Sequence, residues 1–133
     1  MTETARAFLM FVGDAEKALS LYEKTFASAE IVSVERYGDE NEVMKGQIKF
    51  AEMLLGGQRF ILNDTPPVHD FTFTPSMSIF VDVETEAALD SAFAALSADG
   101  KVMMPPDNYG FSEKFAWVSD RFGVSWQINL PAS

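Results

Sequence analysis

The residues able to do acid/base chemistry in this chain are few. The 133 residues include no cysteine and one histidine, His69, which lies in a polar, proline-containing stretch that begins at Asp64. The absence of cysteine removes thiolate nucleophiles and thiolate metal ligands. His69 and Asp64 could form a general acid/base pair, because a carboxylate can orient an imidazole and stabilise its charge. The alternative is that His69 is a solvated loop residue.

A second candidate segment is the stretch 105–113, which contains Pro105, Pro106, Asn108, Tyr109 and Gly110. This composition predicts a long loop, and such loops often carry function and can reach over the mouth of a site. Tyr109 is the third acid/base candidate, and Phe111 adds an aromatic ring two positions later. A contact between two copies of the chain is the alternative role for this loop.

The glycines do not form a nucleotide-binding pattern. A typical methyl-donor site has a glycine-rich turn between a strand and a helix, but here Gly13 stands alone and Gly56-Gly57 joins two strand candidates. There is also no phosphate-binding loop and no Gly-x-Ser-x-Gly nucleophile turn. We therefore predict that the chain uses no cofactor.

Hydrophobic periodicity predicts two similar halves. An apolar strand at 7–12 is followed by Asp14 as a helix N-cap and by an amphipathic helix with Ala15, Ala18, Leu19, Tyr22 and Phe26 on one face. The strands expected next are 29–37, 42–55 and 59–63. In the second half we expect a strand at 76–83, a helix starting near Thr85 and ending at Gly100 as C′ residue, and strands at 101–104, 114–119 and 124–130.

Each half thus has the order βαβββ, and a shift of 70 residues superposes the two helix faces. The sequence predicts a single α+β domain over 1–133, with module 1 at about 5–64, a linker at about 65–75 and module 2 at about 76–131. At this length a second independent core would be too small to stand alone.

Charge limits the partners. Twenty acidic residues against ten Lys and Arg give a formal net charge of −10, and the basic residues are scattered. Such a chain repels phosphate backbones and anionic headgroups, so neither nucleic acid nor a membrane surface is expected as a partner. No apolar run reaches membrane-spanning length, and we expect a cytoplasmic location.

Three motifs carry a family resemblance, and the duplicated βαβββ order with Phe-Leu-Met-Phe-Val at 8–12 supports it. The motifs are Ala-Trp-Val-Ser-Asp-Arg-Phe-Gly-Val-Ser-Trp-Gln-Ile at 116–128, Asp-Phe-Thr-Phe-Thr-Pro at 70–75 and Tyr-Gly-Phe-Ser at 109–112. The chain resembles the PhnB-like branch of the vicinal oxygen chelate superfamily, which includes glyoxalase I and bleomycin-resistance proteins. That branch is often described as a 3-demethylubiquinone 3-methyltransferase domain.

The resemblance implies that the two modules form curved sheets around one cleft, and that the protein is a homodimer. In metal-using members, His or Glu side chains project inward from the first and last strand of each module. The corresponding positions here are Ala7, Ile61 or Asn63, Ser78 or Met77, and Gln127. Because none of these is a His or a carboxylate, we expect no metal site.

These considerations lead to two functional hypotheses of different class, beside a purely structural or interaction role in which the protein's own side chains close the cleft. The first is a metal-independent site for a small apolar or cationic organic molecule, lined by polar and aromatic side chains: Asn63, Ser78, Phe80, Tyr109, Phe111, Trp117 and Gln127. Strand alternation places Gln127 and Trp126 on opposite faces, and the resemblance implies that Gln127 faces the cleft, so Trp126 should pack against a helix. The second is a lyase or isomerase that uses Asp64, His69 or Tyr109, with any metal held by Glu52 or Glu113.

Overall fold

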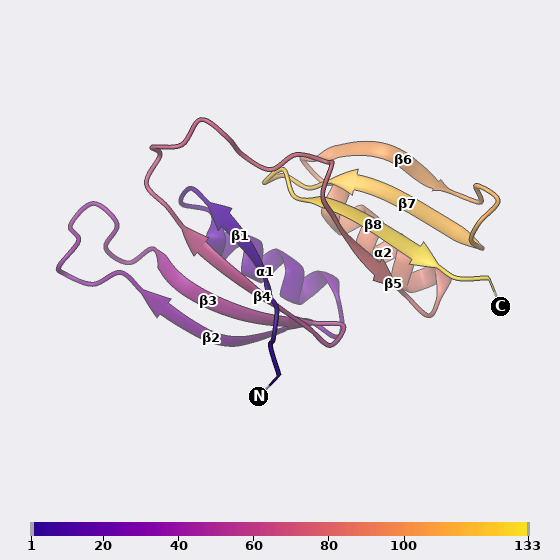
Figure 1. Cartoon of the computed structure of the whole chain (residues 1–133). Helices are drawn as coiled ribbons and strands as arrows, with labels where there is room; N and C mark the ends of the chain where they lie inside the picture. The colour runs from indigo at the N-terminus through magenta and orange to yellow at the C-terminus, as the bar shows by residue number, and fades with distance from the viewer. Residues whose placement is uncertain (1, 133) are drawn as a thin grey trace. The chain divides into compact units, whose positions relative to one another are not determined.

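A computed structural model describes residues 2–132 of the chain, which form two compact units that divide between Asp70 and Phe71. Each unit has the order βαβββ (Figure 1). The first unit contains β1 (Ala7–Phe11), α1 (Ala15–Thr25), β2 (Glu30–Arg36), β3 (Ile48–Leu55) and β4 (Gln58–Asp64). The second contains β5 (Ser78–Asp82), α2 (Glu86–Ser97), β6 (Lys101–Asp107), β7 (Lys114–Ser119) and β8 (Ser125–Leu130).

The two sheets have the same topology. The strand order is β1-β4-β3-β2 in the first sheet and β5-β8-β7-β6 in the second. In each sheet the first and last strands of the unit are parallel neighbours, and the other pairings are antiparallel. The α+β class and the repeated βαβββ order predicted from the sequence are therefore confirmed, with two separate four-stranded mixed sheets that are not closed.

One face of each sheet is covered by the helix of its own unit. In Figure 1, α1 lies behind the strands of the first sheet and α2 behind those of the second. The α1 side is lined by alternate residues such as Leu9, Leu62 and Met53, which are buried. On the α2 side, Trp126 and Val118 are fully buried and adjacent in register. Trp126 thus lies on the helix side, as alternation together with the family resemblance predicted.

The helix ends correct two details of the sequence-based prediction. Asp14 precedes α1 but its side chain makes no cap hydrogen bond. The first helical amide, that of Ala15, instead donates to Asp64 Oδ1 at 2.9 Å. At the end of α2, Asp99 has the positive φ of 59°, whereas Gly100 does not. Gly100 fits there because a Cβ would collide with the carbonyl oxygen of Ser119.

Strand bounds differ from the expectation at two places. The expected strand at 42–55 begins only at Ile48, because turns precede it, one of them with Gly46 at a φ of 85°. In the other direction, β6 continues through Pro105 and Pro106 to Asp107. Proline is tolerated there because β6 is an edge strand, where a missing amide costs no ladder bond on the outer side.

The Gly56-Gly57 hairpin between β3 and β4 is confirmed. Both glycines have positive φ, 57° and 83°, as a tight two-residue connection requires. No helix among residues 2–132 is both long and apolar enough to cross a membrane.

Candidate ligand-binding site

The candidate site is the helix-free face of the second sheet. Lys114 marks the opposite face, because its Nζ pairs with Glu86 and Asp90 of α2 at 3.1 and 2.8 Å. Alternation then places Phe115 and Trp117 of β7 on the helix-free face. The strand register extends this face across the sheet in two rows: Asp107, Phe115, Asn129 and Asp82, and then Met104, Trp117, Gln127 and Phe80.

Four aromatic rings form a cluster at this face. Phe115 is 3% exposed and lies at its centre. The ring of Phe111 is 5.0 Å from that of Phe115, Tyr109 is at 6.1 Å and Phe80 at 6.2 Å, measured between centroids. The three outer rings remain exposed, by 53% for Phe80, 36% for Tyr109 and 60% for Phe111. Phe115 therefore supports an aromatic surface that is open to solvent.

A polar network lies beside the aromatic cluster. The hydroxyls of Ser78 and Ser125 are 2.6 Å apart, so one donates to the other. Trp117 Nε1 donates to Ser125 Oγ at 2.8 Å, and Gln127 Nε2 donates to Ser78 Oγ at 3.2 Å. The two serines carry one hydroxyl hydrogen each, and only one of these hydrogens forms the bond between Ser78 and Ser125. The other hydroxyl hydrogen has no acceptor among residues 2–132. Gln127 Oε1 is likewise an acceptor that these bonds do not use.

A third group of polar contacts places a carboxylate on the same face. Asn129 Nδ2 donates to Asp82 Oδ1 at 2.8 Å, and the other end of the Asn129 amide accepts from the Ser112 hydroxyl. Asp107 stands at the far end of the same row and accepts from the backbone amide of Asn108 at 2.7 Å. Two exposed carboxylates therefore flank the buried ring of Phe115.

The loop between β6 and β7 borders a hollow. The hollow has a volume of about 410 Å³ and is lined by Asn108, Gly110, Phe111, Ser112, Glu113 and Ala132. The loop is held by hydrogen bonds from Tyr109 Oη to the carbonyl of Pro105 at 2.5 Å and from the Gly110 amide to Asn108 Oδ1 at 2.8 Å. These bonds hold the Tyr109 and Phe111 rings near Phe115.

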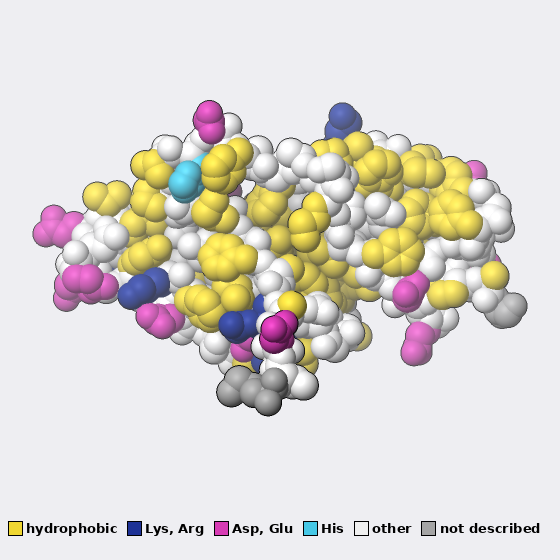
Figure 2. Space-filling view, viewed as in Figure 1, with side chains coloured by type: hydrophobic (Ala, Val, Ile, Leu, Met, Phe, Trp, Pro, Cys, Tyr) yellow, Lys and Arg dark blue, Asp and Glu magenta, His cyan; other side chains and the backbone are white. Residues whose placement is uncertain are grey.

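Figure 2 shows hydrophobic side chains gathered over the strands of each unit. By strand register, the helix-free face of the first sheet carries Phe8, exposed by 53%, and Phe50, exposed by 36%. One polar residue of this face is Asn63, which is in register with Met10. Asn63 Oδ1 is buried without a hydrogen-bond partner among the described residues. Exposed apolar side chains are thus present on the helix-free face of both sheets.

The structure brings together six of the seven ligand-binding residues predicted from the sequence. These six are Ser78, Phe80, Tyr109, Phe111, Trp117 and Gln127, whereas Asn63 belongs to the first unit. Sequence reasoning missed Asp82, Ser112, Ser125 and Asn129, which complete the polar network. Alternation along β8 could have identified two of them, because Ser125 and Asn129 lie two positions before and after Gln127.

The register corrects one position that the resemblance had suggested. Ala7 is the partner of Phe60, and Phe60, Leu62 and Asp64 lie on the α1 side of the sheet. The side chain of Ala7 therefore cannot reach the helix-free face, where Phe8 stands instead. In the second unit Ser78, rather than Met77, is in register with Ser125 on that face.

The three acid/base candidates are Asp64, His69 and Tyr109. Asp64 and His69 belong to the first unit, and Tyr109 lies in the loop between β6 and β7. Asp64 is 2% exposed, and its two oxygens accept from the amides of Ala15 and Ile48 at 2.9 and 3.0 Å. It therefore holds the start of α1 and the start of β3 in place, which is a structural role. His69 is exposed outside the regular elements of the first unit. Tyr109 Oη already donates to a carbonyl.

The two carboxylates considered as metal donors belong to different units. Glu52 binds the guanidinium groups of Arg6 and Arg59, both at 3.0 Å, and Glu113 is an exposed residue of the second unit. Within residues 2–132, no three His, Cys, Asp or Glu side chains come together.

The repeated unit, with its helix on one face of a four-stranded mixed sheet, defines the class of protein. The structure of a glyoxalase/bleomycin resistance protein/dioxygenase domain from Frankia sp. matches with a TM-score of 0.69 over 99% of both chains, at 15% identity. This match shows that the fold is of the glyoxalase/bleomycin-resistance type.

The sequence comparisons narrow the class to a family. Residues 3–129 match the model of the 3-demethylubiquinone-9 3-methyltransferase family, and the chain belongs to that family. The solved PhnB protein of Bacillus cereus is 43% identical, with a TM-score of 0.90 over 96% of this chain and 99% of its own. Protein YjdN of Escherichia coli is 23% identical over 92% of both chains. The PhnB-like resemblance seen in the sequence is therefore confirmed.

Proposed function

We propose that this chain binds a small apolar or cationic organic molecule on the helix-free face of its second sheet, without a metal ion. The observation that carries the proposal is the set of three exposed rings supported by buried Phe115. A monomeric domain normally buries such rings, whereas grouped exposed apolar side chains are typical of binding surfaces.

The preference for a cation follows from the charges around the rings. Asp82 and Asp107 flank Phe115, and the two rows of side chains that contain the aromatic residues include no lysine or arginine. An ammonium group over an aromatic face gains about 0.5–2 kcal/mol. The net charge of −10 adds a long-range attraction. The unused serine hydroxyl hydrogen and Gln127 Oε1 can orient a polar substituent of the ligand.

The methyl transfer in the family name is not part of this proposal. A typical methyl-donor site uses a glycine-rich turn between a strand and a helix of a parallel sheet. The β1–α1 turn contains Gly13 as its one glycine, and both sheets here are mixed. The lyase or isomerase alternative is less well supported, because Asp64 and Tyr109 are already engaged in other hydrogen bonds.

The location of the site can be tested with phenyltrimethylammonium as a cationic aromatic probe and benzenesulfonate as its anionic counterpart. In NMR titrations, the cationic probe should shift the Trp117 indole N–H signal more than the anionic probe does. Phe80→Ser should weaken binding of the cation about threefold to tenfold, since one cation–π contact is lost.

Phe8→Ser is the matched control, because Phe8 and Phe80 are both 53% exposed but lie in different units. It should leave the affinity unchanged. Equal weakening by the two substitutions, or an unchanged Trp117 signal, would contradict the assignment to this face.

We also propose that the protein is a homodimer, as the family resemblance predicts. The exposed side chains on both helix-free faces, such as Phe8 and Phe50 in the first unit, support this because a second copy could cover part of them. Sedimentation equilibrium should give twice the chain mass, and a monomer at micromolar concentration would contradict the proposal.

A further inference from the structure

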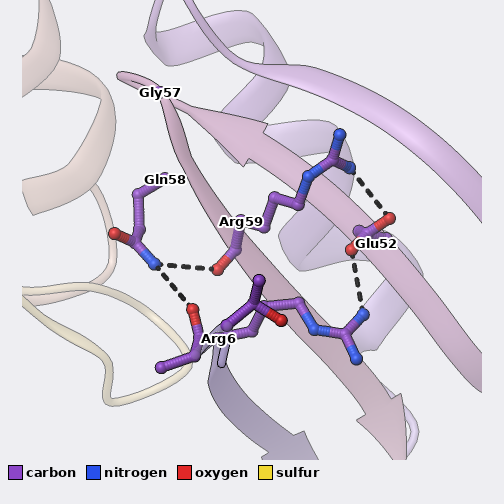
Figure 3. A pocket seen from close by; sticks show the side chains of 7 residues that line it. Arg6, Glu52, Gly57, Gln58 and Arg59 are labelled. Carbon is purple, nitrogen blue, oxygen red and sulfur yellow. Dashed lines mark hydrogen bonds and ion pairs between the residues drawn. The ribbon is translucent and has the colours of Figure 1, made fainter. Parts of the chain in front are cut away.

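A second hollow lies on the first unit, beside the points where the parallel strands β1 and β4 begin (Figure 3). Its volume is about 470 Å³, and it is lined by Thr4, Ala5, Arg6, Glu52, Gly57, Gln58 and Arg59. Arg59 of β4 and Glu52 of β3 point toward one another across the sheet, and Arg6 approaches from the segment before β1 (Figure 3). The side chains belong to the helix-free face of the first sheet.

One carboxylate holds both guanidinium groups in place. Arg6 Nη1 is 3.0 Å from Glu52 Oε2, and Arg59 Nη1 is 3.0 Å from Glu52 Oε1. The Glu52 side chain is 15% exposed, whereas Arg6 and Arg59 are exposed by 41% and 51%. The carboxylate is therefore the covered member of the cluster, and the outer edges of both guanidinium groups face solvent. Holding the two groups in advance lowers the entropy cost of binding a further group.

The cluster has charge and donors left over. Two guanidinium groups and one carboxylate leave one positive charge in a chain whose formal net charge is −10. Each guanidinium has five N–H donors, and the hydrogen bonds formed among residues 2–132 engage only Nη1 of each. Glu30 shares the row of Arg59 across β3, but it does not line the hollow. An arginine edge with unused parallel donors fits the two oxygens of an oxyanion.

We propose that Arg6 and Arg59 together bind one oxyanion, the carboxylate or phosphate group of a small molecule. The site lies on the first unit and does not depend on the aromatic site of the second. The repulsion of phosphate backbones and anionic headgroups expected from the net charge of −10 is a property of the whole molecule. Within about one Debye length of 8–10 Å, however, the charge of the nearby side chains decides whether an anion is attracted.

The side chains in the neighbouring rows of the sheet indicate which other groups such a molecule should carry. Phe8, Ile61 and Glu52 form the row next to Arg59, and Phe8 is exposed. The following row contains Asn63, whose Oδ1 is buried and lacks a donor among the described residues. The fitting ligand is an organic acid with an apolar ring over Phe8, and buried Asn63 Oδ1 lies outside the hollow and is not part of the contact.

The experiment uses benzoate, inorganic phosphate and benzamide, the uncharged analogue of benzoate. The Nε–Hε NMR signals of Arg6 and Arg59 are followed during titration of the full chain. Benzoate or phosphate should shift both signals with saturation, and benzamide should not. Saturation by benzoate alone identifies a carboxylate site, and saturation by phosphate alone identifies a phosphate site.

Arg6→Gln and Arg59→Gln should each weaken binding of the anion at least fivefold. Lys49→Gln is the control, because it removes one positive charge from β3 outside the hollow, where Lys49 pairs with Glu35. Arg59→Lys, which keeps the charge but loses the paired donors, should give an intermediate loss and remains informative if the glutamine variants unfold. Unshifted arginine signals with both anions, or an equal loss in the Lys49 variant, would overturn the proposal.

Discussion

Asp64 holds two backbone amides that belong to different elements of the first unit. The amides of Ala15 and Ile48 donate to its two oxygens, and the side chain is almost completely buried. The carboxylate therefore fixes the start of α1 against β3. An acidic residue at the end of a strand can stabilise the fold in this way, or it can take part in a reaction. The two roles are distinguished by the groups that are hydrogen-bonded to its carboxylate oxygens.

The role of Asp64 predicts a large effect on stability. Asp64→Ala leaves two amides without their partner, and the free energy of unfolding should fall by about 2–4 kcal/mol. Asp14→Ala is the control, because the Asp14 side chain makes no cap bond, and it should change stability by less than about 0.5 kcal/mol. Urea unfolding followed by tryptophan fluorescence measures both. A reversed order of the two effects would show that Asp14 caps α1.

At the scale of the elements, periodicity and turn residues were sufficient to predict the βαβββ order of each unit. The two amphipathic helices, the Gly56-Gly57 hairpin and strand β7 were all found at or near their predicted positions. These features are local, because they depend on spacing within a few residues. The α1 cap was not predictable, because its donor and acceptor lie 49 positions apart.

Strand register limited the prediction of the candidate site for a similar reason. A shift of one residue moves a side chain to the other face of the sheet, as happened for Ala7 and Phe8. In β8, where Trp126 and Gln127 fixed the register, the prediction of the faces was correct. The hydrogen bonds that link Ser78, Ser125 and Trp117 join three strands, and no local pattern in the sequence indicates them.

The attachment of α2 to its sheet depends on pH at the alkaline end. Hydrogen bonds from Lys114 to Asp90 and Glu86 raise the pKa of Lys114 above its ordinary value. Because the pKa is higher in the folded state, the stabilisation is complete below the pKa of an unfolded lysine, about 10.4. It is lost as the pH rises through the higher folded value.

We expect Lys114→Met to remove this dependence. Thermal unfolding of the wild type should lose stability above about pH 10 to a greater extent than the variant does. Lys101→Met is the matched control, because Lys101 begins the neighbouring strand β6 and makes no ion pair within residues 2–132. If the Lys101 variant changed the profile as much as the Lys114 variant, the assignment would be contradicted.

At the scale of the whole molecule, the two units repeat one topology but carry different chemistry on their helix-free faces. The second unit presents aromatic rings with Asp82 and Asp107, whereas the first presents Arg6 and Arg59 beside apolar side chains. The net charge of −10 agrees with the acidic side chains of the second face but not with the arginine pair of the first. Ligand preference in this chain is therefore a property of individual strand rows, which composition cannot supply.

The most direct test of the account is a titration of protein stripped of metal with EDTA, using phenyltrimethylammonium and the Trp117 indole signal. We predict saturable binding whose affinity is the same before stripping, after stripping and after addition of zinc or nickel. Binding that disappears with EDTA and returns with one of these ions would contradict a metal-independent site on the second sheet.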